Sequence, residues 1–391
     1  MKSWKAKKVI FRFIIRFFIL AVAVLFALQI LPRNLAVVLP AMSPFLAVCA
    51  TVAKRSLSPL FLLCLPVLII SLLKGRWFCR NICPVGLIAE YAGKFHLGSK
   101  SKFTALPRLG LWIILLAFGS ALLGYPIFLW LDPLSIFNGF ISAWHMPITL
   151  ASILPGTGLI IIVILNVCMS NSWCRRICPL GFLQELLGSF SAKRPALNKG
   201  RRMFLAAILG GAVGTLIYRA TGRRICIRPP GATEENKFQA LCARCGNCIK
   251  ACPEKIIQPD CGQTGAAGFL TPIITIKPGY CSEWCNECCK VCPTYAIAHI
   301  SLAEKRTVSI GTAVVSKSLC LAWDKQEYCL VCDEYCPYHA IKTIKHKGVN
   351  CPEVDPDICR GCGLCQTVCP AEKCAITVHG HTQRRLQPVE I

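Results

Sequence analysis

Four cysteine quartets, each ending in Cys-Pro, constrain this 391-residue chain more than any other feature. The first and last quartets have the x2, x2, x3 spacing of bacterial ferredoxins, in which three close cysteines hold one cluster and the fourth binds a neighbouring cluster. The two middle quartets keep the later gaps and widen the first gap, which a loop can absorb. The pattern predicts four [4Fe–4S] clusters on sixteen ligands, which are Cys242, Cys245, Cys248, Cys252, Cys281, Cys285, Cys288, Cys292, Cys320, Cys329, Cys332, Cys336, Cys359, Cys362, Cys365 and Cys369.

Zinc is the alternative metal for these quartets, because zinc sites with four cysteine ligands are common. The repeated Cys-Pro ending favours iron–sulfur ligation, since it belongs to the ferredoxin pattern. The two regular quartets match each other, so we expect the first to pair with the fourth and the second with the third. Cysteines that break the spacing, or stand outside it, have no predicted ligand role; they are Cys226, Cys261, Cys289, Cys351 and Cys374.

Charge is divided unevenly along the chain. Residues 1–224 carry 26 Lys and Arg against three acidic side chains, whereas residues 225–391 carry 18 basic and 16 acidic ones. The basic residues of the first part lie between long apolar runs. Nucleic acid is therefore not expected as a partner despite the net charge of +25, and membrane lipid is expected instead.

Five apolar stretches of the first part have lengths suited to crossing a bilayer; they are residues 11–31, 57–73, 109–126, 152–170 and 203–219. Basic residues gather on one side of these stretches. The positive-inside rule then places the N-terminus in the cytoplasm and the ferredoxin domain on the periplasmic side of a bacterial inner membrane. We therefore expect an α-helical membrane bundle of about five transmembrane helices with an internal pseudo-repeat. It would be joined to an α+β polyferredoxin domain of two ferredoxin-like two-cluster modules.

The pair Arg201-Arg202 precedes a short glycine-rich apolar stretch and resembles a twin-arginine export signal placed inside the chain. A domain that acquires its clusters in the cytoplasm must cross a membrane already folded, which this route allows. The alternative is that the pair marks the cytoplasmic end of a helix. The expected organisation is a membrane domain over 1–200, a twin-arginine-type transmembrane segment over 201–224 and a four-cluster domain over 225–391.

The first part also contains an internal repeat. The sequence of residues 77–86 recurs at residues 172–181, an offset of 95, and each copy contains Cys-x3-Cys-Pro. This spacing puts two sulfurs on one face of a helical turn, so two symmetric copies would bring four sulfurs together. A further iron–sulfur centre is predicted on Cys79, Cys83, Cys174 and Cys178. A redox-active dithiol pair, or two pairs each completed by a partner protein, are the alternatives.

Two family resemblances follow from these motifs. Residues 1–195, with their paired Cys-x3-Cys-Pro motifs, resemble the NapH-type quinol-dehydrogenase membrane proteins. Residues 200–391 resemble the NapG/MauM ferredoxin-type proteins, through the twin-arginine start and the segment 227–232 before the first quartet. The resemblance implies a quinol as electron donor and an extracytoplasmic reductase or electron carrier as acceptor. The chain departs from the family pattern by fusing two pieces that are usually separate proteins, and by lacking the two-cluster cytoplasmic tail that NapH-type proteins tend to carry.

The sequence contains no Cys-x-x-Cys-His haem motif, no Rossmann glycine fingerprint and no domain for a terminal substrate. We therefore expect an electron-transfer component of a quinol-dehydrogenase-type complex and not a complete reductase. The alternative function is an iron–sulfur maturation or assembly factor, which would reduce a metal or thiol in a partner enzyme.

Quinol oxidation needs a proton acceptor in a partly apolar pocket, and ionisable residues are scarce in the first part. Asp132 and His145 flank a segment without charge and are the candidate catalytic residues for quinol. Each has an ordinary alternative. Asp132 caps the helix that Pro133 begins, and His145 lies at a membrane interface.

Overall fold

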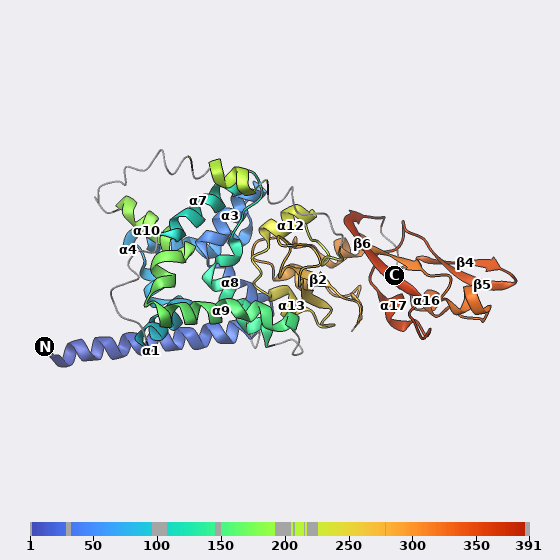
Figure 1. Cartoon of the computed structure of the whole chain (residues 1–391), viewed down its shortest axis with the longest axis horizontal. Coiled ribbons are helices and arrows are strands. Elements are labelled where there is room, and N and C mark those ends of the chain that lie inside the picture. Colours follow the sequence, from blue (N-terminus) through green and yellow to red (C-terminus); the bar gives the residue numbers. More distant parts are fainter. Residues whose placement is uncertain are drawn as a thin grey trace. The chain divides into compact units, whose positions relative to one another are not determined.

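The computed structural model describes residues 2–28, 33–95, 108–144, 150–191, 205, 208–214, 216, 226–277 and 279–387. The chain divides into two compact units, which can be followed by colour in Figure 1. Unit 1 comprises residues 1–221, 239–247 and 293–295, and unit 2 comprises residues 222–238, 248–292 and 296–391. Arg201-Arg202 and His145 lie outside the described residues.

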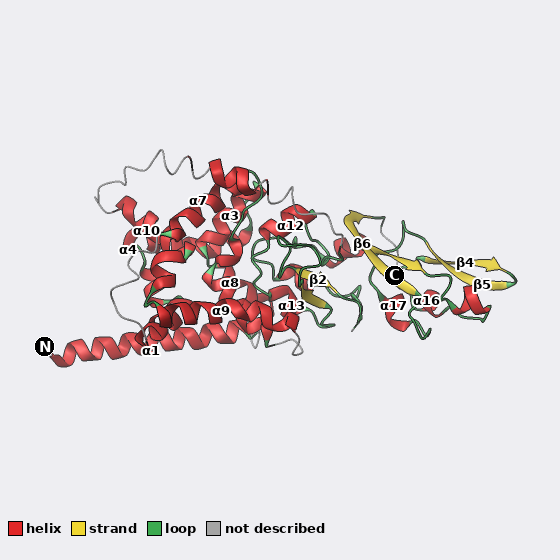
Figure 2. Cartoon of the chain, viewed as in Figure 1, coloured by secondary structure: helices red, strands yellow, loops and turns green. Residues whose placement is uncertain are grey.

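Unit 1 is built from helices (Figure 2). The longer ones are α1 (Lys2–Ala27), α3 (Pro44–Lys54), α4 (Leu65–Lys74), α6 (Pro84–Ala92), α7 (Leu109–Leu122), α8 (Pro133–Ala143), α9 (Leu150–Cys168) and α10 (Pro179–Ser191). Short connecting turns are α2 (Val38–Ala41), α5 (Trp77–Asn81), η1 (Arg33–Val37), η2 (Pro59–Cys64), η3 (Gly93–Phe95), η4 (Leu129–Leu131) and η5 (Trp173–Ile177).

Proline and left-handed residues set the helix boundaries in unit 1. Pro44, Pro84 and Pro133 each occupy the first turn of their helix, where the missing N–H is not needed and φ is already helical. Helix α3 ends at Arg55 with φ 54°, and α4 ends at Gly75 with φ 59°. The helices then pack mainly as α8 on α9, α4 and α7 on α10, and α6 on α9.

The expected bundle of about five transmembrane helices is wrong. None of the helices within the described residues is both long and apolar enough to cross a membrane by itself. The segments Leu35–Ala41 and Pro44–Lys54 reach the required length only together, and they are bent by 92°. The prediction failed because apolar runs are broken in three dimensions: residues 57–73 divide into η2 and α4, and α7 spans only 14 residues, or about 21 Å.

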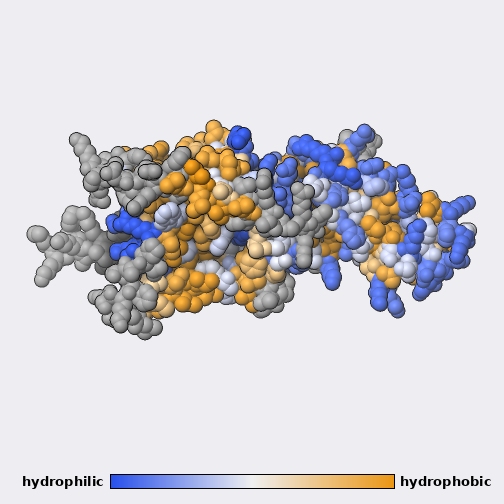
Figure 3. Space-filling view, turned by 45° about the horizontal axis from the view of Figure 1, so that its top comes forward, coloured by the Kyte–Doolittle hydropathy of each residue, from blue (hydrophilic) through white to orange (hydrophobic). Residues whose placement is uncertain are grey.

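Unit 1 exposes many apolar side chains. Leu57, Leu62 and Leu73 are 77%, 66% and 71% exposed. In Figure 3 hydrophobic residues gather over these helices, whereas hydrophilic residues dominate the C-terminal part of the chain. This surface is the main physical difference between the two regions.

Unit 2 has α+β character, with three antiparallel two-stranded sheets (Figure 2). Strand β1 (Ile257–Pro259) pairs with β2 (Pro272–Ile274), β3 (Val308–Val315) with β6 (Ile376–Arg385), and β4 (Ile341–His346) with β5 (Val349–Val354). The short helices of the C-terminal part are α12 (Glu235–Leu241), α13 (Asn247–Ala251), α14 (Glu287–Lys290), α15 (Leu302–Thr307), η6 (Leu321–Lys325), α16 (Val331–Glu334) and α17 (Leu364–Val368). The longest pairing, β3 with β6, begins at Val315 and Ile376 and encloses the third and fourth quartets.

Candidate iron–sulfur sites

The third and fourth quartets form two sites in unit 2, and each site takes one cysteine from the other quartet. In the third-quartet site, Cys320, Cys329, Cys332 and Cys369 line one pocket. In the fourth-quartet site, Cys336, Cys359, Cys362 and Cys365 line a second pocket. The last cysteines of the two quartets are therefore exchanged.

The last cysteine of the first quartet, Cys252, lies near two cysteines of the second quartet, Cys281 and Cys288. Burial raises the pKa of the Cys252 thiol, and its electrostatic interaction with Cys288 raises it further. Burial also raises the pKa of Cys281 to about 11, and both Cys288 and Cys252 contribute in the same direction. We call the set Cys252, Cys281, Cys285 and Cys288 the second-quartet site.

The expected pairing of quartets is therefore wrong, because the third pairs with the fourth and the second is joined by the first. Regular spacing indicates that three cysteines of a quartet can bind the same cluster. It does not indicate which other quartet supplies the fourth ligand. Segments that are consecutive in the chain usually pack together, and that rule decides the pairing here.

Backbone N–H groups point at the sulfurs of these sites. The amides of Ala340 and Ala375 lie 3.4 and 3.5 Å from the sulfurs of Cys336 and Cys369, and outside these sites the Ile297 amide lies 3.4 Å from the sulfur of Cys292, the last cysteine of the second quartet. Each donor follows a turn that begins at Cys-Pro. Hydrogen bonds to sulfur are one of the means by which a protein adjusts an iron–sulfur centre.

The donor set and the cavities fit a cluster. Among the described residues, no three His, Cys, Asp or Glu side chains converge on the position of a single ion. Each thiolate of a cubane binds a different iron, so its ligands surround a wider space than the ligands of one ion. Four cysteines line each of the two pockets, and backbone amides are directed at the sulfurs of Cys336 and Cys369.

The four repeat cysteines of unit 1 also come together, and we call them the inner centre. Burial raises the pKa of the Cys79 thiol, and the nearby Cys83, Cys178 and Cys174 raise it further. Cys83 is the N-cap of α6 and accepts from the Gly86 amide at 3.4 Å, while Cys178 precedes α10 and accepts from the Gly181 amide at 3.4 Å. Two helix N-termini, with free N–H groups and positive dipole ends, are therefore directed at these sulfurs.

Arg76 joins the two copies of the repeat. Its guanidinium donates to the Cys174 carbonyl at 3.0 Å, forms an ion pair with Glu185, and lies 5.1 Å from the Phe182 ring centroid. The corresponding carboxylate of the first copy, Glu90, pairs with Arg16 at 2.8 Å. Sequence reasoning missed both arginines, although their neighbours in the repeat were recognised.

A buried amide lies beside the inner centre without a full set of partners. Gln184 is completely buried, and its Oε1 accepts from the Cys79 amide at 3.4 Å. Its Nε2 has no hydrogen-bond partner within the described residues. An unsatisfied buried donor of this kind suits an anionic neighbour, which fits a centre made of thiolates.

Asp132 is a helix cap. It is completely buried, and its Oδ2 accepts from the amides of Leu134 and Ser135, each at 3.0 Å, while the Ser43 hydroxyl donates to Oδ1. Burial raises the pKa of Asp132 to about 6, against these hydrogen bonds. The capping alternative is thus present in the structure, and the quinol role of Asp132 and His145 stays a prediction.

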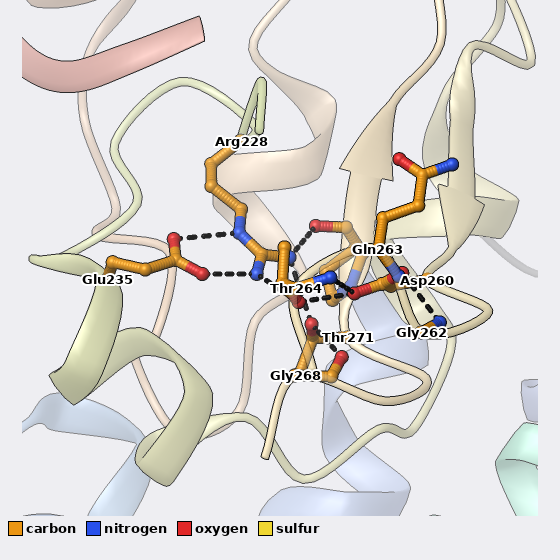
Figure 4. A network of polar contacts seen from close by, with 9 residues as sticks. Arg228, Glu235, Asp260, Gly262, Gln263, Thr264, Gly268 and Thr271 are labelled. Atoms are coloured by element: carbon orange, nitrogen blue, oxygen red, sulfur yellow. Dashed lines mark hydrogen bonds and ion pairs between the residues drawn. The ribbon is translucent and has the colours of Figure 1, made fainter. Parts of the chain in front are cut away.

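The segment before the first quartet is held by a buried polar network, shown in Figure 4. Arg228 is 4% exposed; it donates to Glu235 at 2.9 Å, to the Thr271 hydroxyl at 2.9 Å and to the Pro272 carbonyl at 2.9 Å. Asp260 accepts from the amides of three following residues, Gly262, Gln263 and Thr264. The network gives Arg228 a structural role beside the first quartet.

Comparison with known proteins supports iron–sulfur binding in both parts of the chain. One family model described as a 4Fe-4S binding domain matches residues 57–103 and 152–197, and so covers both copies of the repeat. A second model with the same description matches residues 352–372, in the fourth quartet. No solved structure matches the chain.

Several characterised proteins are similar over about half of this chain. The methylamine utilization ferredoxin-type protein MauM of Methylorubrum extorquens is 34% identical over 48% of this chain and 88% of its own length. The ferredoxin-type protein NapG of Escherichia coli is 35% identical over 46% of this chain and 86% of its own length. NapF of Escherichia coli is 34% identical over 40% of this chain and 87% of its own length. The chain belongs to the family of ferredoxin-type iron–sulfur proteins that includes MauM and NapG, which act in electron transfer.

Proposed function

We propose that this protein relays electrons from a membrane quinol to an extracytoplasmic reductase or electron carrier. The observation that carries the proposal is the combination, in one chain, of exchanged cysteine quartets in unit 2 and a four-cysteine centre in unit 1. A bound [4Fe–4S] cluster supplies reversible one-electron chemistry. A chain with several such sites is suited to carry electrons between two other reactants.

The sixteen cysteines of the quartets would hold four clusters, and Cys79, Cys83, Cys174 and Cys178 would hold a further iron–sulfur centre. Amides of the chain stabilise the thiolates in both places. The residues of the inner centre would also exclude water, since Cys83, Cys178 and Gln184 are all buried.

Oxidation of a quinol releases two electrons and two protons. Asp132 is the candidate acceptor for a proton, because its raised pKa of about 6 allows it to bind and release one near neutral pH. His145 is the second candidate. The NapH-type resemblance of residues 1–195 supports quinol as donor.

We place the protein at the bacterial cytoplasmic membrane, with its ferredoxin domain on the periplasmic side. The exposed apolar side chains of unit 1, among them Leu57 and Leu73, support lipid and quinone as partners. Cell fractionation and protease accessibility of the C-terminal domain in spheroplasts test this placement. A C-terminal domain that is protected in spheroplasts and cut only after lysis contradicts it.

The central test is reduction of the full-length protein by a quinol analogue in lipid vesicles, followed through the visible absorbance of the clusters. We expect bleaching by quinol in the natural protein, and much slower bleaching in Cys79→Ser and Asp132→Asn. Dithionite must still bleach both variants, which shows that their outer clusters are present. Clusters that dithionite reduces and quinol never reduces would rule out the quinol donor.

A further inference from the structure

A lysine is buried beside the second-quartet site. Lys305 lies on α15 and is 5% exposed, and its ammonium donates to the carbonyls of Ser282 and Cys285. The Cys281 side chain lies close enough to interact electrostatically with this ammonium. One ammonium therefore links two backbone carbonyls of the loop that carries Cys281 and Cys285.

The position of Lys305 is fixed by a capping box. The Ser301 hydroxyl accepts from the Glu304 amide at 3.2 Å, and Glu304 accepts in return from the Ser301 amide at 2.8 Å. The side chain of Asn286 adds a second link between the two segments by donating to the Ile300 carbonyl at 2.9 Å. The start of α15 is thus tied to the cysteine loop, and Lys305 points back at it.

Lys305 differs from Lys290 in having no ion-pair partner among the residues that the structure describes. A buried ammonium without a counter-charge is costly, and the groups that can balance it here are the thiolates of the second-quartet site. Lys290, in the same quartet, is different because it is 42% exposed and pairs with Glu287 at 2.7 Å.

The third-quartet site shows the opposite environment. Its cavity is lined by cysteines and by apolar side chains such as Val315, Leu321 and Ile376, and no charged side chain is among the described residues that line it. The two sites therefore have the same kind of ligand set but differ in the fixed charge beside it.

We infer that Lys305 tunes the second-quartet site, raising the reduction potential of its cluster above that of the cluster in the third-quartet site. Reduction adds one negative charge, and a fixed positive charge in a poorly solvated site stabilises the reduced form. Net charge and hydrogen bonds to sulfur are the quantities by which a protein sets such potentials. The inference rests on the ligand assignment proposed above for Cys252, Cys281, Cys285 and Cys288.

The test is an anaerobic redox titration of the full-length, cluster-loaded protein followed by EPR. In Lys305→Met we expect the midpoint of one cluster to move to lower potential while the other midpoints stay in place. Lys305→Arg, which keeps the charge, should retain most of the natural midpoint. Lys290→Met removes a charge from the same quartet at a solvated position and should shift the midpoint much less. An unchanged midpoint in Lys305→Met with full iron content overturns the inference, as does an equal shift in Lys290→Met.

Two further variants keep the result interpretable if Lys305→Met loses its iron or if the responding signal is not assigned. Lys305→Gln keeps hydrogen-bond donors without the charge and replaces Lys305→Met if the latter loses its iron; the same downward shift is expected. Cys281→Ser identifies the signal, because it should remove the cluster that responds to Lys305. If Cys281→Ser leaves all signals intact, the ligand assignment is wrong. If it removes one signal that Lys305→Gln does not shift, only the role of Lys305 is wrong.

Discussion

In unit 1 two cysteines of the inner centre lie at the N-termini of helices, whereas in unit 2 the last cysteines of the third and fourth quartets lie in turns between short elements. Cys83 and Cys178 each precede a helix that begins with proline, and each accepts from a glycine three residues later. Cys336 and Cys369 accept from amides that follow a Cys-Pro turn. Both regions direct backbone amides at cysteine sulfurs, but they do so with different backbone structures.

This difference determines what each region depends on. A helix N-terminus supplies free N–H groups and a positive dipole end from local sequence alone. A turn has no such support, and its shape depends on the packing of the segments around it and on glycines with positive φ, such as Gly361 with φ 71°. The sites of unit 2 should therefore be more sensitive to substitutions far from the cysteines than the inner centre is.

The exchange of cysteines between quartets gives the largest expected effect. Cys336→Ser should remove one cluster, about four iron atoms per chain, from the fourth-quartet site. Adding Cys359→Ser should then cost no further iron, since both residues serve that site, whereas adding Cys320→Ser should remove a second cluster. Anaerobic iron and sulfide analysis with EPR measures this.

The control is Cys374→Ser, which changes a neighbouring cysteine outside the two cavities and should keep its iron. If Cys336→Ser with Cys359→Ser loses two clusters, the exchange does not occur and each quartet binds its own cluster.

A smaller loss tests the inner centre. Cys83→Ser removes one of its four sulfurs, so the full-length protein should lose the iron of that centre and keep the clusters of the quartets. Cys64→Ser, at another fully buried cysteine of unit 1, is the matched control and should leave the iron content unchanged. Equal iron in both variants would favour the dithiol interpretation.

Substitution of Arg228 tests, through the free energy of unfolding, how strongly unit 2 depends on buried contacts far from its cysteines. Arg228→Met leaves Glu235 and two buried oxygen acceptors without their partner, so the free energy of unfolding should fall by about 4 kcal/mol. Denaturant unfolding of the full-length protein, followed through absorbance of the clusters, measures the loss. Arg384, whose side chain is 42% exposed and 3.9 Å from Asp357, provides the control, and Arg384→Met should change stability very little. A fall of similar size in both variants would show that the network in Figure 4 does not stabilise unit 2.

Two glycines of unit 2 give the smallest effect. Gly361 has φ 71°, and a Cβ there would lie 2.4 Å from the Gly311 carbonyl oxygen, so Gly361→Ala should destabilise the protein by about 3 kcal/mol. Gly348 has φ 86° but open space around the missing Cβ, so Gly348→Ala should cost only about 1 kcal/mol. Thermal unfolding of the two variants, measured side by side, gives the difference. Equal losses of stability would mean that the close contact at Gly361 adds nothing to the cost of placing alanine at a positive φ.

Local sequence was enough to single out groups of cysteines, because their spacing is a local feature. The spacing of Cys79 and Cys83 and of Cys174 and Cys178 led to four sulfurs that the structure brings together. The α+β character of the ferredoxin part also followed from its motifs. The transmembrane bundle did not follow, because hydropathy counts apolar residues along the chain and does not record where a helix is broken, as between η2 and α4.

The sequence by itself therefore determined which cysteines we propose as ligands, because the quartets, the repeat and the Cys-Pro motifs are each short stretches of the chain. Only the tertiary structure decided which quartets exchange a cysteine, which arginine links the two copies of the repeat, and which lysine is buried beside a site. These are contacts between residues far apart in sequence, and Arg76 with Cys174 is one example. Their formation depends on the packing of whole elements, and no local spacing or periodicity encodes it.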